Sequence, residues 1–152
     1  MASFVLPAAD ASAEDGKVYP AAFCEGALVG NPPVVSFSVN GVTNNSTTNS
    51  AVLVCPAIKD NVTAVTGINE ANFRYYKAGQ AGVLIDLYSY SAYATSNYLS
   101  SKSDFGANGY KTLSWGALGS YSGGFYGFIV VLPNAPTAPR NRAISYRIDE
   151  ND

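Results

Sequence analysis

Few residues in this chain could carry out acid–base chemistry near neutral pH, and histidine is absent. The chain therefore lacks the commonest general base and metal ligand, and it cannot pair a serine or cysteine nucleophile with histidine. Two carboxylates could still hydrolyse a glycosidic bond. We expect no such pair and no enzyme, and we expect Asp86 to lie on the solvent face of an apolar strand. The acidic residues considered for this chemistry are Asp60, Glu70, Asp86 and Asp104.

The two cysteines, Cys24 and Cys55, are the other reactive side chains. Neither belongs to a Cys-x-x-Cys pair, and no histidine is present to complete a zinc site. Their spacing suits one structural disulfide, which would stabilise the fold by roughly 3–4 kcal/mol by closing a loop in the unfolded chain. The alternative is two buried free thiols. A structural disulfide implies an oxidising compartment, so we expect a secreted or cell-surface protein.

Metal ions and cofactors are not expected. Calcium sites need clustered oxygen ligands, often in an Asp-rich loop. The acidic stretches Asp10–Asp15 and Asp149–Asp152 lie at the two ends of the chain and lack the spacing of an EF-hand.

Charge excludes two classes of partner. Only 13% of the residues are charged, the formal net charge is -2 and the pI is about 5.0. A nucleic-acid-binding surface needs clustered lysine and arginine, and anionic lipid attracts basic segments. No apolar run approaches the length of a membrane span. Residues 1–6 do not read as a signal peptide, so an exported form would have lost its leader.

Aromatic residues supply the best candidates for ligand binding, because sugar rings stack on exposed tyrosine and tryptophan faces. The chain has 11 Tyr and 1 Trp. The competing interpretation is that tyrosine is simply favoured in strands. Between Asp104 and Arg140 the sole charged residue is Lys111, which indicates either two core strands or an exposed aromatic surface. The possible ligand-binding residues are Tyr75, Tyr76, Asp86, Tyr88, Tyr90, Trp115 and Tyr121.

The elements that would position these residues are strands. Apolar and polar residues alternate over many short runs bounded by Gly, Pro and Asn, and no segment shows helical periodicity. Asn40-Gly41 is a possible hairpin turn, although the strand could continue past it. Asn44–Ser50 is a second turn, and Pro133–Arg140 is a loop. The predicted strands are Lys17–Cys24, Val35–Val39, Ala51–Cys55 (stopped by Pro56), Val62–Tyr76, Val83–Tyr90, Tyr98–Asp104, Tyr110–Trp115, Phe125–Leu132 and Ala143–Asp149.

Alternation assigns the faces of two of these strands. In the strand that begins at Val83, one face, which we expect to point inward, holds Val83, Ile85 and Leu87, and the other holds Leu84, Asp86, Tyr88 and Tyr90. The last strand should be half-exposed, because Ala143, Ser145, Arg147 and Asp149 alternate with Ile144, Tyr146 and Ile148.

About eight or nine strands without crossover helices predict an all-β fold, an antiparallel β-sandwich of jelly-roll or immunoglobulin-like topology. We assign residues 17–152 to this single domain and residues 1–16 to an N-terminal arm. Phe4, Val5 and Leu6 form an apolar patch in that arm. Burying them would offset the ordering of a short segment, so we expect them to add an edge strand to the chain's own sheet or to a neighbour's.

The run from Cys24 to Asp149 resembles a group of small exported bacterial proteins of unassigned function, common in myxobacteria and other proteobacteria. The resemblance implies export and a β-sandwich, and it implies no activity. Members usually carry a second cysteine pair, and Ile85 and Val130 stand at the matching positions; we expect them to pack on adjacent strands. The residues that carry the resemblance are Cys24, Val42-Thr43-Asn44-Asn45-Ser46, Val54-Cys55-Pro56, Leu87-Tyr88-Ser89, Trp115-Gly116-Ala117-Leu118, Leu132-Pro133 and Ile144-Ser145-Tyr146-Arg147-Ile148-Asp149-Glu150.

Together these features predict a non-catalytic, exported or cell-surface β-sandwich with an interaction, adhesion or structural role, including self-assembly. The alternative is a carbohydrate-binding, lectin-like module that uses exposed Tyr and Trp. The expected partners are further copies of the chain or surface glycans, with no nucleic acid and no membrane insertion.

Overall fold

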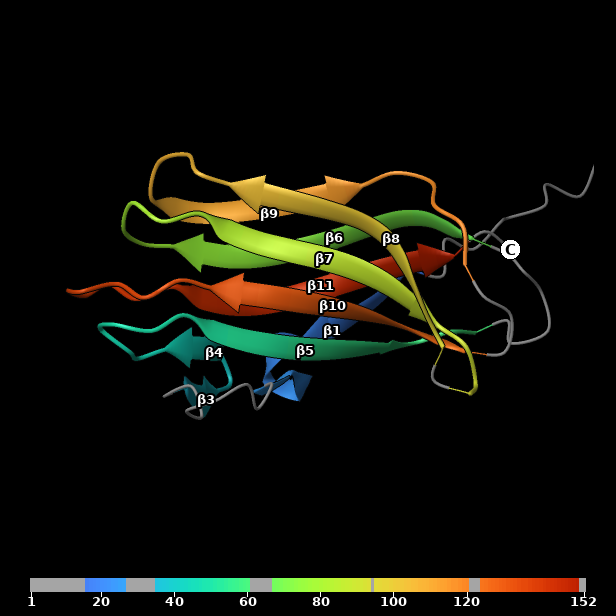
Figure 1. The fold of residues 1–152 in the computed structure, drawn as a ribbon, viewed down its shortest axis with the longest axis horizontal. Coiled ribbons are helices and arrows are strands. Elements are labelled where there is room, and N and C mark those ends of the chain that lie inside the picture. The colour runs from blue at the N-terminus through green and yellow to red at the C-terminus, as the bar shows by residue number, and fades with distance from the viewer. Residues whose placement is uncertain (1–15, 27–34, 61–66, 94, 121–123, 151–152) are drawn as a thin grey trace, which may run out of the picture.

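The computed structural model describes residues 16–26, 35–60, 67–93, 95–120 and 124–150, which fold into two β-sheets packed face to face (Figure 1). Every strand pair is antiparallel, as expected for a sandwich. The first sheet contains β1 (Lys17–Pro20), β3 (Val35–Ser38), β4 (Gly41–Asn44), β6 (Ile68–Lys77), β9 (Gly109–Trp115) and β11 (Arg142–Glu150). The second sheet contains β2 (Glu25–Gly26), β5 (Ala51–Ile58), β7 (Val83–Tyr90), β8 (Ser96–Asp104) and β10 (Phe125–Leu132).

The strand order is that of a jelly roll. In the first sheet it is β4-β11-β6-β9, and in the second it is β5-β10-β7-β8. Successive strands from β4 to β7 alternate between the two layers, and so do those from β8 to β11, which is the double Greek key of that fold. The predicted β-sandwich is confirmed, with jelly-roll rather than immunoglobulin-like connections. The described residues hold eleven strands rather than eight or nine, because β2 is a separate strand and the residues around Gly41 form two strands.

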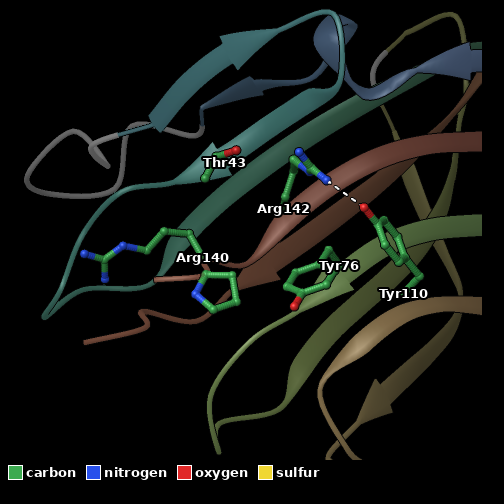
Figure 2. Close-up of a pocket in the computed structure, with 6 residues that line it drawn as sticks. Thr43, Tyr76, Tyr110, Arg140 and Arg142 are labelled. Atoms are coloured by element: carbon green, nitrogen blue, oxygen red, sulfur yellow. Dashed lines mark hydrogen bonds between the residues drawn. The ribbon is translucent and has the colours of Figure 1, made fainter. Parts of the chain in front are cut away.

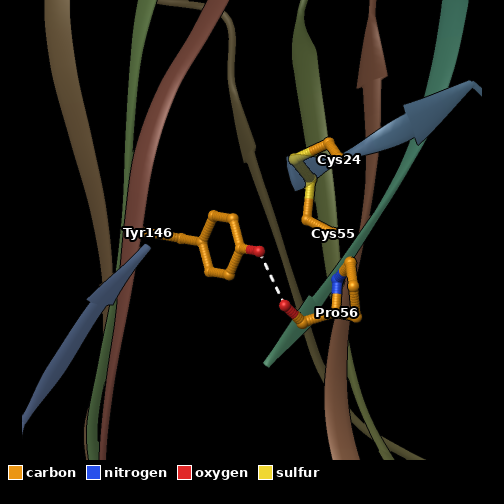
Figure 3. The surroundings of a disulfide bond; sticks show 4 residues. All are labelled: Cys24, Cys55, Pro56 and Tyr146. Carbon is orange, nitrogen blue, oxygen red and sulfur yellow. Dashed lines mark hydrogen bonds between the residues drawn. A yellow bond between two sulfur atoms is a disulfide. The ribbon is translucent and has the colours of Figure 1, made fainter. Parts of the chain in front are cut away.

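The predicted disulfide between Cys24 and Cys55 is present (Figure 3). The 3-10 turn η1 (Ala21–Phe23) carries the chain from β1 in the first sheet to β2 in the second, and Cys24 lies between η1 and β2. Cys55 points inward from β5, and both cysteines are buried. The disulfide therefore joins the crossover between the layers to the middle of β5.

Alternation along the strands supplies the core. In β7 the inward side chains are Val83, Ile85 and Leu87, all fully buried, as the sequence predicted. Ile85 is the direct cross-strand partner of Val130 in β10, and Val130 is equally buried. The expected contact between these two residues is present.

Four aromatic rings join the two sheets. Phe73 of β6 lies 5.4 Å from Phe128 of β10, measured between ring centroids, and Tyr146 of β11 lies 5.6 Å from Phe128. Trp115, at the end of β9, lies 5.5 Å from Phe128. The buried Tyr146 hydroxyl donates a 2.6 Å hydrogen bond to the carbonyl oxygen of Pro56 across the sandwich (Figure 3). Burial satisfied by such a bond stabilises the pairing of the layers.

Asn44 is a fully buried polar residue at the end of β4. Its side-chain amide nitrogen lies within hydrogen-bonding distance of the carbonyl oxygens of Asn49, Leu132 and Pro133, at 2.9–3.2 Å. Its side-chain oxygen accepts from the backbone N–H of Ser46 at 2.9 Å. This one amide therefore ties the 45–50 turn to the end of β10 in the opposite sheet.

Two local predictions need correction. The predicted strand ending at Cys55 continues to Ile58, because Pro56 pairs with Gly127 on one side while β2 covers β5 only along Leu53 and Val54. A proline on an uncovered strand edge removes no ladder hydrogen bond. The hairpin near Gly41 exists, but its two turn residues are 39 and 40, and Gly41 (φ 114°) begins the return strand.

The predicted alternation of the last strand is also wrong at its start. The register between β11 and β6 shifts between Ala143 and Ser145, leaving Ile144 out of the pairing. This bulge reverses the side-chain parity, so Ala143, Tyr146 and Ile148 are all buried. An extra residue in one strand has this effect because side chains alternate with a period of two.

Candidate functional site

The structure separates the predicted ligand-binding residues into core and surface positions. Tyr75 and Trp115 lie in the core, with 1% and 2% of their surface exposed, because both point inward from the first sheet. They do not face a ligand, which corrects the prediction for these two residues. Tyr76 points outward from the first sheet, and Asp86, Tyr88 and Tyr90 point outward from the second. Tyr121 and the arm residues Phe4, Val5 and Leu6 lie outside the described residues.

A row of outward side chains crosses the first sheet near one end. Arg142 of β11 is in register with Thr43 of β4 on one side and Tyr76 of β6 on the other, and Tyr76 is in register with Tyr110 of β9. This row borders a hollow of about 410 Å³, which we call the tyrosine–arginine pocket (Figure 2). Its lining residues are Thr43, Tyr76, Tyr110, Pro139, Arg140 and Arg142.

Of the two tyrosines that line the pocket, Tyr110 is the more exposed, with 72% of its surface accessible. Its ring meets that of Tyr76 edge to face, with centroids 5.1 Å apart and planes at 73°. The Arg142 guanidinium donates to the Tyr110 hydroxyl through Nη2, at 3.4 Å. These two contacts hold an exposed aromatic ring beside a cationic group (Figure 2).

The pocket is electropositive at short range. Arg142 Nε and Arg140 Nη1 are shielded from solvent, and neither has a hydrogen-bond acceptor in the described part of the chain. Among those same residues, no carboxylate forms an ion pair with either arginine. Arg147, farther along β11, is different, because its Nη1 lies 3.3 Å from Glu70. The hollow is therefore lined by two arginines whose positive charge no carboxylate of the described residues offsets by an ion pair.

The outer face of the second sheet has the opposite character. Ile58, Phe125 and Tyr90 stand in one cross-strand row, and Tyr88 and Tyr98 stand in the next. Tyr90 stacks on Phe125 at 4.7 Å, and Tyr88 meets Tyr98 at 5.6 Å. We call these five residues the aromatic face.

Apolar surface continues from the aromatic face around the edge of β5. The outward positions of β5, β7 and β10 hold one charged residue, Asp86. A hollow of about 500 Å³ follows, with an entirely apolar lining: Tyr19, Phe23, Pro56, Ala57, Ile58 and Phe125.

The carboxylates considered for hydrolysis have separate structural partners. Asp104 accepts a 2.8 Å hydrogen bond from the Tyr75 hydroxyl, and Asp60 is ion-paired with Lys17. Burial alone would raise the pKa of Asp104, but hydrogen bonds from Tyr75 and the Gly106 N–H, together with nearby lysines, hold it below its ordinary value. In the described ranges no three His, Cys, Asp or Glu residues group closely enough to hold a metal ion.

A buried lysine–serine pair was not foreseen. Lys59 Nζ lies 2.8 Å from Ser120 Oγ and 5.9 Å from the centroid of the Tyr126 ring. Burial lowers the pKa of Lys59, and the nearby Glu150 opposes that shift. Lys59 and Ser120 are 3% and 8% exposed, so the pair packs between the layers and does not face a ligand.

Sequence reasoning missed Tyr110, Arg140 and Arg142 as members of one site. The usable signal was the outward parity of Tyr110 and the Arg-x-Arg pair that follows the proline-rich loop. What places them together is the cross-strand register, which the sequence alone did not define.

No family model matches the chain, and no curated protein matches it. Among solved structures, the chain is similar to a carbohydrate-binding module, CBM36, in complex with calcium and xylotriose. The TM-score is 0.51 at 10% identity, over 89% of this chain and 99% of that one. The two share a β-sandwich fold.

Two further structures are similar at lower scores. One is the K1 cleaved adhesin domain of Lys-gingipain from Porphyromonas gingivalis W83, with a TM-score of 0.42 and 15% identity over 90% of this chain and 91% of that one. The other is a structure of promiscuous carbohydrate-binding modules of the β-sandwich superfamily, with a TM-score of 0.40 and 11% identity over 94% of this chain and 59% of that one. The described residues contain no helix long and apolar enough to span a membrane.

Proposed function

We propose that this chain is a non-catalytic adhesion module of an exported or cell-surface protein, and that it holds a surface glycan in the tyrosine–arginine pocket. The observation that carries the proposal is the exposed Tyr110 ring, which contacts Tyr76 and Arg142 and lines a hollow together with two arginines. Saccharides present apolar C–H faces for ring stacking and hydroxyl oxygens for hydrogen bonds. A pocket that combines an aromatic surface with a few polar groups fits both requirements.

Three further observations support this role. The disulfide between Cys24 and Cys55 favours an oxidising compartment. The absence of histidine from the sequence and the separate partners of Asp60 and Asp104 argue against hydrolysis. The fold is shared with a module that was solved with xylotriose, so the architecture is compatible with glycan binding.

A glycan array with the wild-type chain and Tyr110→Ala tests the proposal. We expect the substitution to weaken binding to every glycan that the wild-type chain binds on the array. The loss should be about tenfold or more, since losing an aromatic contact of about 1.4 kcal/mol gives that factor. Tyr93→Ala is the matched control, because Tyr93 is a 94% exposed tyrosine in the loop between β7 and β8. Equal glycan binding by wild type and Tyr110→Ala would refute the assignment of the pocket.

Self-assembly through the aromatic face is a second candidate function. Its supporting observation is the nearly uncharged outer surface of β5, β7 and β10, where two copies of the chain would meet without like-charge repulsion except at Asp86. Rings stacked on one another, as Tyr90 is on Phe125, turn their faces inward and suit an apolar partner better than a sugar.

Light scattering over a range of concentrations tests this second function. We expect reversible dimers that Phe125→Asp abolishes, because a buried unpaired charge opposes association. Val39→Asp is the control, since Val39 is a 95% exposed apolar residue in the turn between β3 and β4. A wild-type chain that stays monomeric at every concentration would remove self-assembly from consideration.

A further inference from the structure

We infer that the tyrosine–arginine pocket selects saccharides that carry a carboxylate, such as the uronic acid units of an acidic polysaccharide. This inference rests on the proposed glycan-binding function and adds the chemical class of the ligand. Three features of the structure support it: the arginines in the pocket, the charges around the pocket and the adjoining surface.

The first feature is the pair of arginines in the pocket. Arg142 has one hydrogen-bond acceptor within the described residues, the Tyr110 hydroxyl at 3.4 Å, which is long for such a bond. Arg142 and Arg140 both line the pocket, and no carboxylate of the described residues forms an ion pair with either. A guanidinium presents a rigid fork of N–H groups that matches the two oxygens of a carboxylate. A neutral sugar hydroxyl offers this fork one uncharged oxygen, whereas a carboxylate offers two oxygens in matching geometry and a full negative charge.

The second feature is the distribution of charge around the pocket. The net charge of the chain is -2, yet all four of its arginines lie on β6 and β11 or in the loop just before β11. Arg147 is neutralised by Glu70 at 3.3 Å, and its Nη2 lies 3.9 Å from Asp149. The tyrosine–arginine pocket has no acidic lining residue. Local positive charge therefore persists at this site in an otherwise acidic molecule.

The third feature is a second hollow on the adjoining surface. Tyr110 also borders a second hollow of about 270 Å³, which is lined by Arg74, Tyr75, Tyr110, Lys111, Thr112 and Ile144. Tyr110 is therefore flanked by two hollows, each with at least one basic side chain. A polyuronate such as polygalacturonate or alginate carries one carboxylate per sugar, so sugars along the chain could place one carboxylate in each hollow with a sugar ring against Tyr110. A single small anion would need only one of the hollows.

Isothermal titration with matched polymers tests this inference. The probes are polygalacturonate, alginate and hyaluronate, which are acidic, and fully methyl-esterified polygalacturonate, which keeps the backbone but masks its carboxylates. We expect at least one acidic polymer to bind, and we expect polygalacturonate to bind about tenfold or more tightly than its ester, as a charge-assisted hydrogen bond implies. Poly-L-glutamate, an anion without sugar rings, should bind at least tenfold more weakly than the acidic saccharide.

Two variants locate the effect. Arg142→Gln should lower the affinity for the acidic polymer by about tenfold more than it lowers the affinity for the ester. Arg147→Gln removes the same charge from the same strand outside the pocket, and it should leave both affinities within about twofold. Arg140→Gln, which lies in a loop, repeats the test in case Arg142→Gln lowers the melting temperature.

The outcomes separate this inference from the proposed function. Equal affinity for polygalacturonate and its ester, with both lost in Tyr110→Ala, would overturn the acidic preference and leave glycan binding intact. Equal affinity for poly-L-glutamate, or a preference that survives both Arg142→Gln and Arg140→Gln, would also overturn it. Binding of neutral glycans on the array with no binding of any acidic polymer would have the same meaning.

Discussion

Removing the disulfide should cost a calculable part of the stability. The cysteines are 31 positions apart, and the chain-entropy relation gives about 3.7 kcal/mol at 25 °C for a loop of this length. Replacing both Cys24 and Cys55 by Ala frees this loop in the unfolded chain. For a chain of this size the loss should lower the melting temperature by roughly 10 °C.

The assay is urea unfolding followed by the fluorescence of Trp115, a buried ring that contacts Phe128 of the opposite sheet. The midpoint should fall and the m-value should rise in the double Ala variant, because its unfolded chain is more expanded and exposes more surface. Wild-type protein reduced while unfolded and then refolded should behave like the variant.

A loss below about 1 kcal/mol would refute this reasoning, because it would show that the unfolded chain gains little freedom when the loop opens. A loss well above 5 kcal/mol would also contradict it. Such a result would mean that the bond also stabilises the folded structure of the crossover between the sheets, in addition to its effect on the entropy of the unfolded chain.

Three other changes have expected outcomes. Asn44→Ala should destabilise the chain by about 2–4 kcal/mol in chemical unfolding, because it removes the side-chain donor that the carbonyl oxygens of Asn49 and Leu132 share; a loss near zero would contradict this. Ile85→Cys combined with Val130→Cys should form a second disulfide, seen as no free thiol on titration of the unfolded protein, since the two residues are direct partners. Asp104→Asn should destabilise the chain at pH 7, and the difference from wild type should shrink as pH falls through and below 3.8, the ordinary pKa, because the folded-state pKa is lowered and the stabilising carboxylate is lost by protonation; a pH-independent difference would exclude the charge of the carboxylate as its cause.

Much of the fold followed from local patterns. The period-two alternation in β7 identified its buried face correctly, and the apolar run Phe125–Leu132 is the central strand of its sheet. The disulfide followed from two cysteines without another use. These features were accessible because they depend on residues close in sequence or on elimination.

The features that depend on neighbouring strands could not be predicted in the same way. Pro56 can lie inside a strand because β2 does not extend along β5 as far as Pro56. The bulge at Ile144 is a feature of the register between β11 and β6. The tyrosine–arginine pocket is of the same kind. Tyr76 was a candidate from its type alone, but its association with Tyr110 and Arg142 comes from the register of three strands.

The pairing of β1 with β11 has a mechanical consequence for the adhesion role proposed above. Lys17 lies opposite Ile148, so a pulling force applied at residues 17 and 150 would act at the same end of this antiparallel pair. The hydrogen bonds between the two strands would then break one at a time, as in a zipper, and at lower force than in shear. Extension beyond Cys24 would transfer the load to Cys55 in the middle of β5, so the residues between the cysteines would carry no tension. The molecule would therefore extend by the length of β1 and its connection to Cys24 at low force, and further extension would require a higher force.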